Sequence, residues 1–192
     1  MLLNRIFALF LLTFGTAAMA GTLDFNLRNS SAQVQYSAPM GREELGKTQF
    51  QLGGLYSEYG NDNNTMFDAG LAVKDEIGSK APGFSAGAGI KALAAHTVGT
   101  NESAIAIGGM LRYSPPSLSR LGIIGQLYFS PNITTFGDAD RYEQSEAQVE
   151  YAIIPNAAVY IGYRNIQFDL NTGGKSKTTL DEGAFVGVRM SF

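Results

Sequence analysis

The chain has 192 residues and a formal net charge of −3, with 23 glycines, one histidine and no cysteine. This length supports one domain or at most two, and so excludes a large multidomain enzyme. The lack of cysteine excludes disulfides, thiolate zinc sites, cysteine nucleophiles and a lipid-anchored N-terminal cysteine, and the charge gives no basic footprint for nucleic acid. Only 16% of the residues are charged. The uncharged residues Gly, Ser, Asn, Thr and Gln take the place of charged ones, and this mixture favours β-structure over helices.

The first twenty residues have the pattern of an export signal. Arg5 supplies a positive start, residues 6–14 are apolar, and Ala18-Met19-Ala20 is a cleavage site of the small-x-small type. Nine apolar residues are too few for a membrane-spanning helix, which needs about 20. We therefore expect a signal peptide over 1–20 and a single exported domain over 21–192.

Two short alternating segments follow the signal. Leu23, Phe25 and Leu27 alternate with polar residues, as do Val34 and Tyr36 after a turn at residues 29–31. Each segment has only about seven residues, whereas a transmembrane strand has about 9–11. We expect the pair to be the first two strands of a ten-stranded structure, with an eight-stranded structure as the alternative.

Eight further segments alternate between apolar and polar residues with the period of a β-strand. They cover 48–58, 65–74, 84–93, 103–113, 121–130, 144–154, 157–169 and 179–192. The proline-containing links at 114–117 and 154–156 predict compact turns. The polar links at 59–64, 94–102, 131–143 and 170–178 predict longer loops on the opposite side, as in outer-membrane barrels.

Three features indicate that the apolar face points outward into lipid. The chain carries an export signal and ends in an aromatic residue, Phe192, as the C-terminal targeting strand of bacterial outer-membrane barrels does. Aromatic residues lie near the predicted strand ends, where interfacial girdles require them. The polar face is rich in Gly, Gln and Ser with few charges, which suits a confined lumen. The sequence therefore predicts an all-β, antiparallel, up-and-down transmembrane barrel in the outer membrane of a Gram-negative bacterium.

The chain also resembles a known family. The early strand pair TLDFNLRNSSAQVQYS, the glycine-rich hairpins and the terminal VGVRMSF are similar to the YfaZ-type outer-membrane proteins. The resemblance covers the whole domain after the signal. It implies the location and the fold, and it leaves the function open because the family carries no settled activity.

Strand registers predict which charges meet inside the barrel. If opposed residues around Pro155 sum to 310, Glu146 faces Arg164 and the apolar residues of both strands share the other face. A sum of 234 around residues 115–116 places Arg112 opposite Gly122, and a sum near 159 brings Asp68 beside Lys91. The candidate lumen-lining charges are Asp68 and Lys91 with Glu146 and Arg164 towards the loops, Lys74, Arg112 and Arg189 towards the periplasm, and Glu150 between the two levels.

Two readings of these charges stay open. Opposite charges in a narrow lumen are most simply structural, because buried charges must be paired. Rings of charge also form gates and selectivity constrictions in pores. The sequence thus predicts a structural barrel or a narrow conduit for small solutes or ions, with a cell-surface binding module acting through the loops as the alternative.

Catalytic and metal sites have little support in the sequence. His96 is followed by Glu102 and Ser103, but proximity along a loop is not a catalytic geometry, so a hydrolase is the weakest reading and we expect no enzyme. The loop acids Asp62, Asp138, Asp140 and Glu143 do not have the spacing of an EF-hand, and we expect neither a metal nor a cofactor. The expected partners are outer-membrane lipid, periplasmic chaperones and the barrel assembly machinery, with Ala18, Ala20 and Phe192 as targeting residues.

Overall fold

The computed structural model describes residues 20–40, 47–60, 62–78, 81–97, 100–170 and 176–192. The predicted signal peptide lies outside these residues except for Ala20, so its cleavage stays a prediction. In the described part of the chain no helix is long and apolar enough to cross a membrane.

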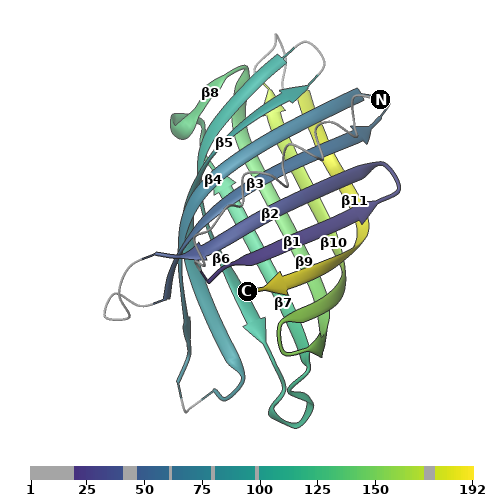
Figure 1. The fold of residues 1–192 in the computed structure, drawn as a ribbon. Helices are drawn as coiled ribbons and strands as arrows, with labels where there is room; N and C mark the ends of the chain where they lie inside the picture. Colours follow the sequence, from purple (N-terminus) through teal and green to yellow (C-terminus); the bar gives the residue numbers. More distant parts are fainter. Residues whose placement is uncertain (1–19, 41–46, 61, 79–80, 98–99, 171–175) are drawn as a thin grey trace.

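The strands form one closed antiparallel sheet (Figure 1). Apart from β8, strands that follow one another along the chain are hydrogen-bonded to each other, with β7 paired to β9, and β11 returns to pair with β1. The short strand β8 pairs with β6 beyond the end of β7, so β7 and β8 share one position in the wall. The strands are β1 (Thr22–Arg28), β2 (Ser31–Pro39), β3 (Lys47–Tyr59), β4 (Asp62–Glu76), β5 (Phe84–Thr97), β6 (Thr100–Tyr113), β7 (Leu121–Ser130), β8 (Thr135–Gly137), β9 (Ala139–Ile154), β10 (Ala157–Leu170) and β11 (Ser176–Ser191).

The barrel therefore has ten strand positions, as the favoured prediction requires, and the eight-stranded alternative is wrong. Strands β1 and β2 are short, but both are full members of the wall. β1 pairs with β2 over its whole length and with β11 from Thr22 to Leu27. Without this hairpin, β3 and β11 would have no partner on one side, and the sheet would keep two open edges.

One of the three predicted registers is correct and two are shifted by two residues. Glu146 lies opposite Arg164 and Val149 opposite Ile161, as predicted. On β6 and β7, however, Arg112 lies opposite Ile124 instead of Gly122. The link between these strands contains a 3-10 turn, η2 (Pro116–Leu118), which moves the centre of the turn by one residue. A shift of two residues leaves every side chain on its predicted face, because the pleat has a period of two.

The register between β4 and β5 shows the same displacement. Asp68 lies opposite Leu93, and Lys91 lies opposite Gly70. The predicted neighbours are therefore diagonal instead of directly opposed.

The predicted contrast between long loops and short turns is wrong for two loops. Segments 59–64 and 94–102 are mostly strand, because β3, β4, β5 and β6 extend to Tyr59, Asp62, Thr97 and Thr100. Segment 131–143 also folds back on the barrel through η3 (Asn132–Thr134), β8 and the start of β9. We call the end with these links the loop end, and the end with Thr22 and Phe192 the terminus end.

Contacts between strands that are not neighbours identify the inner face. Lys91 on β5 contacts Gln144 on β9, and Asn64 on β4 contacts Leu180 on β11, which is possible only across a lumen. The opposite face carries exposed apolar side chains, as a membrane barrel presents them to lipid. This outer band includes Leu27, Leu52, Phe67, Leu71, Ile90, Ile107, Leu127, Val149, Ile161, Tyr163, Val186 and Val188.

Side chains fill the loop-end half of the lumen with an apolar layer. Met66, Tyr142, Ile166, Phe168 and Leu180 have no measurable exposure to solvent. The rings of Tyr142 and Phe168 pack with their centroids 5.0 Å apart. The other residues of the same cluster complete the layer: Leu55, Leu93, Ala95, Ala104, Ala106, Tyr128, Ala139 and Leu170.

Glycines on the inner face accommodate these large side chains. The ring of Tyr128 lies over Gly108 and Gly89, that of Tyr160 over Gly187, and that of Phe185 over Gly162. At these positions an aromatic ring from another strand occupies the space beside the glycine.

This packing predicts that an added methyl group is costly inside the barrel and harmless outside it. The Cβ atom of Gly108→Ala would lie 2.2 Å from the Leu127 carbonyl oxygen and 2.4 Å from Tyr128 Cδ1. We expect a loss of about 1–3 kcal/mol in the free energy of unfolding, measured by urea denaturation in micelles. Gly125→Ala on the outer face meets nothing within 4 Å and is expected to stay within about 0.5 kcal/mol. Equal losses would show that the lumen has space at Gly108.

The orientation of the two faces predicts an asymmetric response to charge. Ile107 is 61% exposed on the outer face, and Ile107→Arg is expected to cost about 2–4 kcal/mol near the bilayer midplane. The control is Gln126→Arg, which faces the lumen opposite Glu146 and should cost less. Urea unfolding in lipid vesicles measures both variants, and an equal cost would mean that the faces are reversed.

Candidate functional site

Two clusters of charged side chains cross the lumen. The lower one lies towards the terminus end and joins four strands. Arg189 on β11 contacts Asp24 on β1 through Nε at 2.8 Å, and its Nη1 contacts Glu150 on β9. Glu150 also pairs with Arg112 on β6. Two arginines and two carboxylates therefore form one chain of ion pairs without net charge. Glu150, which we expected between two levels, belongs to this lower cluster.

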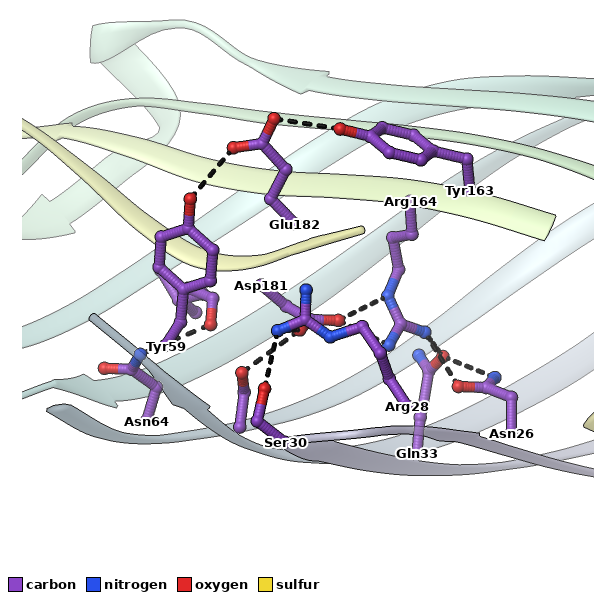
Figure 2. A network of polar contacts seen from close by, with 12 residues as sticks. Asn26, Arg28, Ser30, Gln33, Tyr59, Asn64, Tyr163, Arg164, Asp181 and Glu182 are labelled. Atoms are coloured by element: carbon purple, nitrogen blue, oxygen red, sulfur yellow. Dashed lines mark hydrogen bonds and ion pairs between the residues drawn. The ribbon is translucent and has the colours of Figure 1, made fainter. Parts of the chain in front are cut away.

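The upper cluster is centred on Arg164, which is completely buried (Figure 2). Its guanidinium donates to Asp181 through Nε at 2.9 Å and through Nη2 at 2.6 Å. Nη1 donates to Asn26 Oδ1 at 3.1 Å and also to Gln33 Oε1. Asp181 is buried as well and accepts from Ser57 and pairs with Arg28, each at 3.1 Å.

Glu146 is therefore opposite Arg164 but is not its ion-pair partner. The guanidinium points towards β11, β1 and β2, where Asp181 and the two amides receive it. Opposition in the strand register places two Cα atoms side by side, and it does not decide which way a long side chain extends. The predicted Glu146–Arg164 pair is replaced by Arg164–Asp181.

Asp181 was absent from the predicted site although the alternation contains it. In the alternation of β11, Asp181 falls on the same face as Phe185, Gly187 and Arg189, which face inward. Asp24, Asn26 and Arg28 likewise share the polar face of β1. Extending the alternation to the ends of the strands would have identified these residues. At the bulge, Ile166 pairs with Asp181 and Gln167 pairs with Thr179, so Leu180 has no partner in the β10–β11 register. No pattern in the sequence predicts this bulge.

The remaining predicted charges also face the interior. Lys91 is buried, donates to Gln144 and lies 4.5 Å from the centroid of the Tyr128 ring. The Asp68 carboxylate lies over Gly53 on the neighbouring strand. Lys74 is half-buried opposite Lys47 near the terminus end.

The structure does not assemble the residues considered for catalysis. His96 points to the outer face and contacts Asn101 at 2.8 Å. Glu102 is buried on the inner face, where it accepts hydrogen bonds from Thr97 and Thr100. Histidine and carboxylate therefore lie on opposite sides of the wall, whereas a catalytic triad needs them in contact.

The loop acids are dispersed. Asp140 accepts from Asn132, and Glu143 accepts from Gln167 at 2.7 Å. Asp62 starts β4, and Asp138 lies between β8 and β9. Within the described ranges no three His, Asp or Glu residues are grouped so that they could hold a metal ion.

The C-terminal residue closes the terminus end of the wall. Phe192 exchanges backbone hydrogen bonds of 2.7 and 2.9 Å with Gly21. Its ring is 60% exposed and stacks on Tyr36 with the centroids 6.4 Å apart. The aromatic terminus is thus displayed on the barrel surface instead of packed in the lumen.

The upper cluster predicts a large loss of stability when Asp181 is neutralised. Asp181→Asn leaves the buried guanidinium of Arg164 without its counter-charge, which costs about 3–5 kcal/mol in comparable buried pairs. Glu146→Gln should cost less, since Glu146 forms none of the contacts of Arg164. Asp169→Asn is the control, because Asp169 lies 3.9 Å from Arg141 in an exposed pair and should cost under about 1 kcal/mol. Urea unfolding of the three variants would contradict this assignment if Glu146→Gln were the most damaging.

The chain is similar to a sequence family, to a curated protein and to several solved structures. A family model described as YfaZ precursor matches residues 5–192. The Outer membrane protein YfaZ of Escherichia coli (strain K12) is 31% identical over 94 residues, which are 49% of this chain and 50% of that protein, so the match spans about half the length of this relative. Among solved structures, the KdgM porin has a TM-score of 0.41 at 12% identity, covering 90% of this chain and 99% of its own. The translocator domain of autotransporter NalP from Neisseria meningitidis has a TM-score of 0.37 at 12% identity, covering 98% and 94%. Since the family model spans nearly the whole sequence, this chain belongs to the YfaZ family and is an outer-membrane β-barrel.

Proposed function

We propose that this protein is a structural outer-membrane barrel whose lumen is closed by its own side chains. The observation that carries the proposal is the apolar layer of Met66, Tyr142, Ile166, Phe168 and Leu180, all without solvent exposure. A conducting pore through a barrel of this size would need a continuous polar path along the lumen. The apolar layer interrupts that path at the loop end.

The charge clusters support the same proposal. Selectivity filters present charges to a passing ion, whereas Arg164 and Asp181 present theirs to each other. The lower cluster likewise pairs both of its arginines with carboxylates. Charges that are already neutralised by partners hold the strands together and offer little field to a solute.

The alternative functions have less support in the geometry. A binding surface built from loops could not include most of segments 59–64 and 94–102, because these segments are largely strand. A hydrolase would need His96 and Glu102 on one face, and they lie on opposite faces. The proposal includes outer-membrane lipid on the outer band, and recognition of the exposed Phe192 ring by the assembly machinery after delivery by periplasmic chaperones.

Conductance in planar bilayers tests the proposal. We expect the refolded wild-type barrel to show no stable unit conductance. The double variant Tyr142→Ala, Phe168→Ala removes the two rings of the layer that have no solvent exposure and is expected to show discrete open-channel steps. Heat-modifiable migration in electrophoresis would verify that both proteins are folded. Stable steps from the wild-type barrel would overturn the proposal and favour a narrow conduit.

A further inference from the structure

A groove of about 700 Å³ crosses the lipid-facing surface of five consecutive positions in the wall, β5, β6, β7, β9 and β10. Small residues form its floor, and at Gly125 an added Cβ atom would meet nothing within 4 Å. Leu111 and Leu127 form its sides, 49% and 66% exposed. The other floor residues are Ala86, Gly109 and Ala147.

The groove is straight because one line of register partners runs along it. Ala86 lies opposite Leu111, and Leu111 lies opposite Gly125. Gly125 lies opposite Ala147, and Ala147 lies opposite Tyr163. Five strands give four spacings of about 4.8 Å, so the line is about 19 Å long. The strands of a membrane barrel tilt by about 35–45°, so this line descends obliquely through most of one leaflet, which is about 15 Å thick.

The end of the groove on β9 and β10 reaches the polar border of the outer band. Tyr163 and Ser145 line this end, and the Tyr163 hydroxyl donates to Glu182. Asn165 lies opposite both Ser145 and Glu182, so these three outward residues form one polar row. The next outward residues towards the loop end are polar as well: Glu143, Arg141, Gln167 and Asp169.

The groove therefore has a polar end and an apolar end. Amphipathic rings with polar tips, such as that of Tyr163, mark the head-group level of a membrane protein. At the other end, Ala86 and Leu111 lie two residues from the terminus-end limits of β5 and β6, among exposed apolar residues of the outer band. An outer-leaflet lipid has the same polarity, with a polar part at the membrane surface and a chain below it.

A second barrel fits this groove less well than a lipid chain. The depression is one row of residues wide, so the convex wall of another barrel would rest on Leu111 and Leu127 and leave the glycines uncovered. Within a membrane no hydrophobic force favours one apolar occupant over another, and the occupant that makes the most close contacts is favoured. A chain of methylene groups can follow the floor along its whole length.

We propose that the groove binds one straight, saturated acyl chain of an outer-leaflet lipid, with the polar part of the lipid beside Ser145 and Asn165. A cis double bond bends the chain away from the line of floor residues, so an unsaturated chain makes fewer contacts. This inference specifies the lipid contact included in the proposed function. It rests on the membrane location and is independent of whether the lumen conducts.

Dipalmitoyl and dipalmitoleoyl phosphatidylethanolamine test the proposal, because they share a head group and a chain length and differ in a cis double bond. The full barrel is refolded in mixed micelles with equal amounts of both lipids, purified, and analysed by native mass spectrometry. We expect one retained lipid per barrel and an enrichment of the saturated lipid of about fivefold, the ratio that follows if the bent chain forfeits roughly five to ten carbon contacts. Equal retention of the two lipids, or a lipid-free dimer of barrels, would overturn the proposal.

Two matched glycine variants locate the binding. Gly125→Leu fills the floor without a clash at Cβ and should reduce the enrichment to near unity. The control is Gly54→Leu, at a lipid-facing glycine opposite Phe67 on β4, where the nearest atom to an added Cβ lies at an ordinary 3.6 Å. It lies outside the groove and should preserve the enrichment. Heat-modifiable migration verifies that both variants are folded, and the site would be disproved if both kept or both lost the enrichment.

Discussion

The burial of one guanidinium group constrains the centre of this barrel. Arg164 is fully enclosed, and a charge removed from water must be compensated by an opposite charge and by hydrogen bonds. Asp181 supplies the charge, while Asn26 and Gln33 supply acceptors from β1 and β2. The arginine on β10 therefore links β11 to the hairpin that closes the sheet. Without this hairpin, the Arg164 guanidinium would lose the two amide acceptors that Asn26 and Gln33 supply.

The same hairpin explains the irregular half of the molecule. Because β1 and β2 are short, the described part of β11 before Val186 pairs with no strand on that side. A regular strand there would leave its backbone groups on that side without partners. The bulge at Leu180 turns both Leu180 and Asp181 inward. Leu180 then completes the apolar layer and Asp181 reaches Arg28 and Arg164. Gly183, with φ of 146°, adopts a backbone conformation that few other residues tolerate and leaves space for Arg28.

The sequence predicted the faces of the strands better than their contacts. A period of two assigns each residue to a side, so Val149, Ile161 and Arg164 were placed correctly, and even a register error of two residues moved none to the wrong face. Contacts depend on features without a periodic signal. The 3-10 turn at Pro116 displaced one register, and the side chain of Arg164 extends away from Glu146. The segments 59–64 and 94–102 have the composition of loops, because polar residues at strand ends resemble loop residues, although strands extend into both.

The closure of the lumen follows from how glycines and aromatic residues are paired. A barrel of ten strands is wider than one of eight, whose interior is just filled by side chains. Here Tyr128 is placed over Gly108 and Tyr160 over Gly187, so a ring lies flat across a neighbouring strand instead of standing upright beside another side chain. Rings in this orientation reach the centre, where Lys91 lies over Tyr128 and Arg164 over Phe185. The extra width of ten strands is thus occupied by rings and by the cations that lie over them, and the inner-face glycines are the residues that make room for the rings.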